Sequence, residues 1–254
     1  METAYRTDIG RIRVVNEDRV LVDNNLNGFT FAIVADGMGG HKAGDVASQM
    51  AIELIHQELQ LLQAGMSAEE CMDKMKTAVS KANESIYASA VNQEQYYGMG
   101  TTVVIVLVSA EGLIVAHIGD SRVYKWNGEH ISQLTEDHSL VNELLKSGQI
   151  SRDEANHHPR RNVLTRALGT EEVTDLEIQH LHWEPNDVLL LCSDGLSGFV
   201  DKDQMIEILR TNHNLEWKVN RLVDRALETG GDDNITVILL ANDRYSWDEK
   251  EGNA

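Results

Sequence analysis

Short hydrophobic runs bounded by glycine, asparagine or aspartate recur along the chain, and such runs are typical of β-strands. They cover residues 20–22, 29–35, 103–108, 113–118, 122–126, 188–192 and 235–240. Between the first two runs, Asn27-Gly28 is a strong signal for a hairpin turn. The turns between residues 103 and 126 are very short, whereas parallel neighbours need a long crossover. The pattern therefore predicts that these three runs pair as antiparallel strands, and it argues against a parallel doubly wound fold.

Longer stretches between the strands carry apolar residues at helical spacing. Three residue pairs have the spacing of a capping box, which marks the start of a helix: Ser67 with Glu70, Ser151 with Glu154, and Asp201 with Gln204. The pattern predicts helices over residues 46–62, 68–90, 140–145, 201–209 and 215–227, with a further turn after Ser151.

One domain is favoured, because the chain shows no linker, internal repeat or low-complexity run. We expect this domain to cover residues 1–242 and to be followed by a polar tail, residues 243–254. Residues 138–168 are polar and contain no long strand, and an insertion of this kind is usually a lid or a binding loop. We expect it to form a flap that contacts substrate, with Arg160 and Arg161 taking part, and not to belong to the core.

Composition and charge narrow the class of partner. The chain has 254 residues, 42% of them hydrophobic, and a formal net charge of −19. Such a charge makes nucleic acid or an anionic membrane surface an unfavourable partner, and it suits a protein that concentrates cations. There is no apolar signal-peptide core and no run long enough to cross a bilayer. Cys71 and Cys192 do not make a disulfide framework. We therefore expect a cytoplasmic protein with no membrane insertion.

Aspartates stand at the ends of the predicted strands. Asp36, Asp120 and Asp194 follow apolar runs and each adjoins a glycine, whereas Asp18 and Asp233 come just before runs. One interpretation is that these are ordinary turn residues, because aspartate and glycine are common in turns. The alternative is that the strand ends bring the aspartates together.

A converged set of carboxylates cannot stay fully ionised without cations. Oxygen ligands alone select hard ions such as Mg²⁺ or Mn²⁺, and two such ions are the usual machinery for attack on a phosphoryl centre. Arg13 lies a few residues before Asp18, and its planar guanidinium can bind two phosphate oxygens. The pattern thus favours phosphoryl chemistry, with Arg13 as the group that binds substrate.

Six short motifs occur in a fixed order: Arg13-x-x-Asn16-Glu17-Asp18, Ala35-Asp36-Gly37-Met38-Gly39-Gly40, Gly98-x-Gly100-Thr101-Thr102, Gly119-Asp120-Ser121-Arg122, Ser193-Asp194-Gly195 and Asp233-Asn234. In this order they resemble the metal-dependent serine/threonine protein phosphatases of the PPM (2C-type) family, and most closely its small bacterial stand-alone members. The resemblance spans nearly the whole chain. It implies an α+β fold, a four-layer α-β-β-α sandwich of two antiparallel sheets flanked by helices.

The resemblance also implies an activity: hydrolysis of phosphoserine and phosphothreonine in proteins by a metal-activated water, opposing a cognate serine/threonine kinase. The cofactors would be two core ions, Mn²⁺ or Mg²⁺, with a weaker third, and we expect a monomer. By this resemblance, Asp36 bridges the two core ions, the Gly37 carbonyl binds one of them, and Asp194 and Asp233 complete the other. Glu17 and Asp18 act mainly through metal-bound water. Asp120, together with Asp194, holds the third ion. Arg13, Asp36 and Asp194 would be the catalytic residues.

One position departs from animal members of the family, which place a histidine, a candidate general acid, directly after the Asp-Gly pair. Here that residue is Met38, so the proton donor is either a metal-bound water or the nearby His41.

Three other classes of function remain as alternatives. A binding module could sense metal or phosphopeptide without turnover, although an intact set of acids favours an enzyme. A nucleotide site at Gly37 and Gly39 lacks the full glycine fingerprint, since Lys42 stands at the third glycine position. A nucleophilic role for Cys192 lacks a neighbouring arginine or histidine in the sequence.

Overall fold

The fold is described from a computed structural model for residues 1–39, 43–109 and 112–242. The candidate proton donor His41 and the expected tail, residues 243–254, lie outside the described residues.

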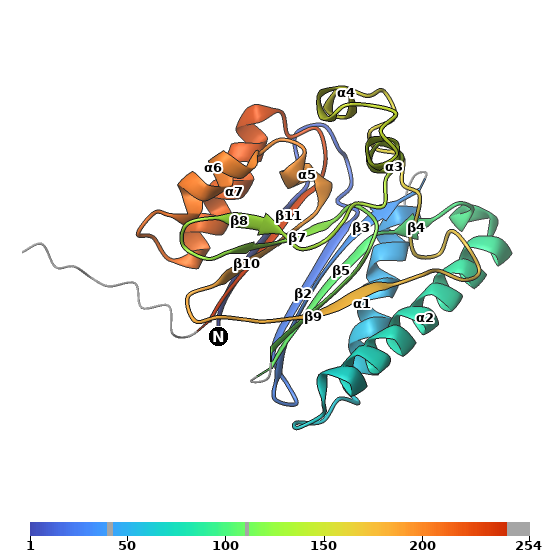
Figure 1. The fold of residues 1–254 in the computed structure, drawn as a ribbon. Coiled ribbons are helices and arrows are strands. Elements are labelled where there is room, and N and C mark those ends of the chain that lie inside the picture. The colour runs from blue at the N-terminus through green and yellow to red at the C-terminus, as the bar shows by residue number, and fades with distance from the viewer. Residues whose placement is uncertain (40–42, 110–111, 243–254) are drawn as a thin grey trace, which may run out of the picture.

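Two antiparallel sheets form the centre of the molecule (Figure 1). The first sheet has the spatial order β1 (Glu2–Asp8), β11 (Ile235–Ala241), β10 (Val188–Cys192), β7 (Arg122–Trp126) and β8 (Ile131–Gln133). The second has the order β2 (Asp18–Leu26), β3 (Phe29–Met38), β5 (Val103–Ser109), β6 (Gly112–Ile118) and β9 (Glu177–Leu181), and the short β4 (Gly100–Thr101) pairs with the end of β3.

Helices cover the outer face of each sheet (Figure 1). The second sheet is covered by α1 (Ala43–Leu59) and α2 (Ala68–Asn92), and the first by α6 (Lys202–Leu209) and α7 (Leu215–Thr229). The remaining elements are short: η1 (Glu94–Tyr96), α3 (Leu140–Lys146), α4 (Arg152–Asn156) and α5 (Asp194–Ser197). The predicted α-β-β-α sandwich is confirmed.

The alternation of side chains along β3 shows how the layers hold together. Phe31 and Ile33 pack into the core beneath α1 and α2, whereas Ala32 and Val34 pack into the core between the two sheets. Because side chains point to opposite faces at successive positions, a strand that is apolar throughout can serve both cores. This is why the run reads as continuous hydrophobic sequence.

Most predicted local signals are present. The capping boxes at Ser67, Ser151 and Asp201 each have both of their hydrogen bonds. The hairpin between β2 and β3 turns at Asn27 and Gly28, whose φ angles of 52° and 94° suit these two residue types.

The predicted pairing of three successive strands is wrong at its last step. Strand β5 pairs with β6, but β7 does not pair with β6: it lies in the other sheet, beside β10 and β8. The short connection through Gly119, Asp120 and Ser121 therefore crosses between the sheets instead of closing a hairpin. A tight turn limits distance but does not decide which sheet the next strand joins. As a result, Asp120 lies where the two layers meet.

Two further expectations need correction. Asp36 does not follow its strand but lies within β3, which continues to Met38. The expected flap also contributes to the core at its C-terminal end: Ala167 and Leu168 are buried, and Leu168 forms a β-bridge with Thr101. Strand β9, which brings the chain back into the second sheet after the flap, has no strong hydrophobic run and was not predicted.

Candidate active site and metal centre

Strand register brings the aspartates to one end of the sandwich. Asp18 begins β2 and is the direct partner of Asp36 in β3. In the other sheet, Asp194 follows β10 and Asp233 precedes the neighbouring strand β11. Asp120 lies in the connection that joins the two sheets. All five predicted aspartates thus lie at adjoining strand ends.

Asp18 ties the two sheets together. Its Oδ2 accepts hydrogen bonds from Ser193 Oγ and Thr236 Oγ1, both at 2.7 Å, and both donors belong to the other sheet's strand ends. Its second oxygen, Oδ1, is buried and has no hydrogen-bond partner, and the same is true of Glu17 Oε1. A buried carboxylate oxygen without a partner is costly. These oxygens are the kind of group that a divalent cation, or water bound to it, would satisfy.

Mutual repulsion of the carboxylates is strong at Asp36. Removal from water, followed by the charges of Asp18, Asp194, Asp120 and Asp233, raises its pKa well above the ordinary value. Burial likewise raises the pKa of Asp18 and of Asp120 to about 7, and that of Asp194 to about 6. Bound cations would offset this repulsion and allow the acids to ionise together. The donor set, made of oxygen atoms only, fits Mg²⁺ or Mn²⁺.

Arg13 lies at the rim of this cluster. Its Nη2 is 2.7 Å from Asp233 Oδ2, and nearly half of its side chain is exposed. The guanidinium is therefore held beside the acids while its outer face remains open to solvent. A phosphate group that approaches the cluster would meet it there.

Gly37 and Glu17 are joined by a backbone hydrogen bond beside the cluster. The Gly37 N–H donates to the Glu17 carbonyl at 3.2 Å, and Ser48 Oγ donates to the same oxygen at 2.6 Å. A side chain at position 37 would collide with the Gly44 carbonyl at the start of α1. Glycine at this position is thus required by the close approach of the helix to the strand.

Some residues that build the site had no role assigned from sequence. Thr102 Oγ1 accepts a hydrogen bond from the Asp36 N–H at 3.1 Å and lies 2.8 Å from Ser121 Oγ. Asn234 Oδ1 accepts from the Glu17 N–H at 2.8 Å. These hydroxyl and amide residues lie inside the six motifs, which is the signal that could have pointed to them. Their hydrogen-bond partners, however, are set by tertiary structure.

Comparisons with known proteins agree with this arrangement. A family model described as protein phosphatase 2C matches residues 13–229. A serine/threonine phosphatase, Stp, from Listeria monocytogenes is 42% identical over 243 residues, which cover 96% of each chain. The structure of the S. agalactiae serine/threonine phosphatase matches with a TM-score of 0.89 and 34% identity, over 95% of this chain and 99% of that one.

A further solved structure carries ions. The catalytic domain of the serine/threonine protein phosphatase PstP, in complex with two manganese ions, matches with a TM-score of 0.80 and 34% identity, over 94% of this chain and 96% of that one. The sandwich and its acid cluster, together with these matches, place the chain among the metal-dependent phosphatases. The chain belongs to the protein phosphatase 2C family and is a serine/threonine protein phosphatase, with phosphoproteins as its substrates. Among the described residues, no helix is long and apolar enough to cross a bilayer.

Proposed function

We propose that the acid cluster holds two core divalent cations, Mn²⁺ or Mg²⁺, and a weaker third. Asp36 is the bridging ligand of the core pair, because the charges of the other four aspartates all act on it. The Gly37 carbonyl binds one core ion, and Asp194 and Asp233 complete the other. The convergence of five aspartates at one end of the sandwich is the observation that carries the proposal.

Glu17 and Asp18 contribute mainly through bound water. Each has a buried oxygen without a hydrogen-bond partner, and two hydroxyls already hold the other oxygen of Asp18. Asp120 binds the third ion together with Asp194, whose charge is the strongest charge acting on it. A cation held by few carboxylates and many waters binds weakly.

When bound, the cations lower the pKa of a water to make it a nucleophile and offset charge on the phosphoryl group. Arg13 orients the phosphate, since its fork matches two of the oxygens. Asp36 and Asp194 would take part in catalysis by holding the cations beside the phosphate. Met38 cannot donate a proton, so a metal-bound water would protonate the leaving serine or threonine oxygen, with His41 as the alternative donor.

The wider setting follows from these roles. The catalytic unit is the single domain of residues 1–242, and residues 138–168 form a flap over its substrate side. We expect a cytoplasmic monomer that reverses the action of a cognate serine/threonine kinase. Nucleic acid is not a partner, because the net charge of −19 repels phosphate backbones.

Hydrolysis in ¹⁸O-labelled water tests this reaction. With Mn²⁺ present, a phosphoserine peptide should release phosphate that carries one labelled oxygen, and quenched turnover should trap no phosphorylated protein. EDTA and the substitution Asp36→Asn should each abolish release. A covalent phosphoenzyme would contradict the mechanism, and metal binding without any release of phosphate would favour a binding module instead.

A further inference from the structure

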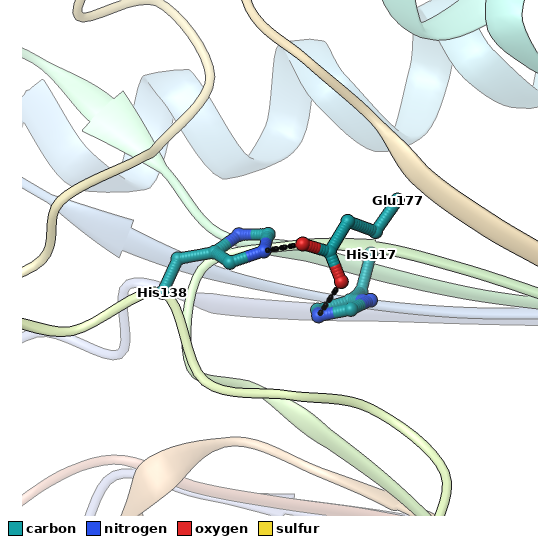
Figure 2. A group of neighbouring side chains, drawn as sticks. All are labelled: His117, His138 and Glu177. Carbon is teal, nitrogen blue, oxygen red and sulfur yellow. Dashed lines mark ion pairs between the residues drawn. The ribbon is translucent and has the colours of Figure 1, made fainter. Parts of the chain in front are cut away.

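A histidine at the start of the flap contacts a glutamate on the strand that follows the flap. His138 stands just before α3, and Glu177 begins β9, where the chain re-enters the second sheet. His138 Nε2 lies 3.0 Å from Glu177 Oε1 (Figure 2). Arg166, within the flap, lies 3.3 Å from the same oxygen. The pair thus closes the base of the flap.

His138 also forms hydrogen bonds with the turn that carries Asp120. Its Nδ1 accepts a hydrogen bond from the Gly119 N–H at 3.1 Å, and its own backbone N–H donates to the Gly119 carbonyl at 3.0 Å. A neutral imidazole has one donor and one acceptor nitrogen. Since Nδ1 accepts, Nε2 carries the proton and donates it to Glu177, so each contact fixes the tautomer that the other needs.

His117 completes the cluster. It lies opposite Glu177 in the pairing of β6 with β9, and its ring stacks on that of His138 with centroids 4.7 Å apart. His117 Nε2 is 2.7 Å from the Glu136 carbonyl oxygen and 3.3 Å from the Glu136 backbone nitrogen. Ligand atoms of the three residues lie within 4.8 Å of one another, a spacing that a metal could use. However, both ring nitrogens of His138 are already engaged within the protein, Nδ1 by the Gly119 N–H and Nε2 by Glu177.

We propose that His138, held by Glu177, is a positioning residue that sets the place of Asp120 and thereby the affinity for the third cation. This inference rests on the proposed role of Asp120. Gly119 has a φ of +105°, a conformation that glycine adopts readily, so the backbone of the turn depends on outside contacts for its position. Both the N–H and the carbonyl of Gly119 are bonded to His138, and these two contacts fix the turn that carries Asp120.

The first test compares His138→Leu with His138→Asn. Leucine loses both side-chain hydrogen bonds, whereas an asparagine Oδ1 can still accept from the Gly119 N–H. His138→Leu should raise the Mn²⁺ concentration for half-maximal activity about three- to tenfold, the range expected for losing such contacts. His138→Asn should stay within about twofold, as expected when the accepting bond is kept. Calorimetry should show the tight Mn²⁺ sites unchanged in both variants.

His130→Leu is a matched control, since the His130 side chain is 85% exposed and lies on the β7–β8 turn. It should leave the Mn²⁺ requirement as in the wild type. Glu177→Ala covers the case in which His138→Leu does not fold, because Glu177 is nearly half exposed and tolerates replacement. It should raise the Mn²⁺ requirement about two- to threefold by freeing His138.

A double-mutant cycle separates positioning from a general effect on folding. In the background of Asp120→Asn, adding His138→Leu should not raise the Mn²⁺ requirement further, because the group it positions is gone. Additive effects, an unchanged requirement in His138→Leu, or loss of the tight sites would each overturn the inference. So would a rise in melting temperature with Zn²⁺ that His138→Leu abolishes, since that would identify a metal site. If Asp120→Asn itself leaves the Mn²⁺ requirement unchanged, the proposed third-ion site fails and the inference falls with it.

Discussion

Burial of the aspartate carboxyl groups in the cluster lowers the free energy of unfolding of the metal-free protein at neutral pH. In the metal-free protein, burial raises the pKa of Asp18 and Asp120 to about 7 and that of Asp194 to about 6. Their ordinary value in an unfolded chain is about 3.9. Between these limits the folded state holds more protons than the unfolded state. These groups therefore make their full contribution to the free energy of unfolding below about pH 4, where they are protonated in both states. That contribution is lost as pH rises through about 7.

We predict that Asp18→Asn stabilises the metal-free protein at pH 8 but not at pH 5. Asparagine can still accept from Ser193 and Thr236, while the buried charge is gone. The change in unfolding free energy between the two variants should shift by on the order of 2–4 kcal/mol across this range. Urea denaturation in EDTA at both pH values measures it, and comparing variants cancels the titration of other groups such as His117. A variant effect that is the same at both pH values would contradict the raised pKa of Asp18.

Local signals in the sequence predicted the secondary-structure elements better than the spacing of the strands predicted how they pair. Capping boxes and the Asn27-Gly28 turn are complete within a few residues, so they can be recognised without the fold. The sheet joined by β7 depends on which layer buries its apolar face, and short spacing does not contain that information. Likewise, the convergence of Asp18 and Asp194 could be suspected from their places at strand ends. The hydroxyls of Ser193 and Thr236 that hold Asp18 became evident only when the two sheets were placed together.

The short helix α5 places Asp194 by lying directly on the start of β11. A Cβ at Gly195 would collide with the Asn234 carbonyl oxygen, and backbone atoms cannot move aside easily. We predict that Gly195→Ala destabilises the protein by about 1–3 kcal/mol, as overpacking usually does, and weakens tight Mn²⁺ binding. Gly198→Ala, just after the same helix, should have a smaller effect, because its Cβ would lie 3.0 Å from the nearest backbone oxygen, against 1.9 Å at Gly195. Thermal melting and calorimetry of both variants check this, and equal effects would count against close packing as the cause.

The flap, residues 138–168, is the element that we expect to distinguish a phosphoprotein from a small substrate. Arg160 and Arg161 are exposed on it, so they can meet a phosphoprotein without supporting the core. We predict that Arg160→Ala with Arg161→Ala lowers kcat/KM for a phosphopeptide about tenfold, as loss of charged hydrogen bonds would, and leaves hydrolysis of a small aryl phosphate nearly unchanged. Lys74→Ala with Lys76→Ala, both exposed on α2, is the charge-matched control. Equal losses on both substrates would show that the arginines support the fold or the metals.

In the molecule as a whole, the acid cluster lies at the junction of the two sheets, so cation binding and the sandwich are coupled. Asp18 contributes from one sheet, and its hydrogen-bond donors, with Asp194 and Asp233, come from the ends of strands in the other. Without cations, repulsion between these acids acts across the interface that the central hydrophobic core holds closed. With cations bound, the same acids would link the two sheets through the ions that they share.

The last prediction follows from that coupling. Mn²⁺ at about 100 times its dissociation constant should add roughly 2.7 kcal/mol to the free energy of unfolding if the unfolded chain does not bind it. For a protein of this size that corresponds to a rise in melting temperature of about 5–10 °C, and EDTA should reverse it. Asp36→Asn should abolish most of the rise, because we propose Asp36 as the ligand shared by the core ions, whereas Asp73→Asn, exposed on α2, should keep it. A wild-type melting temperature that does not depend on Mn²⁺ would mean that the acids do not form a cation site across the sheets.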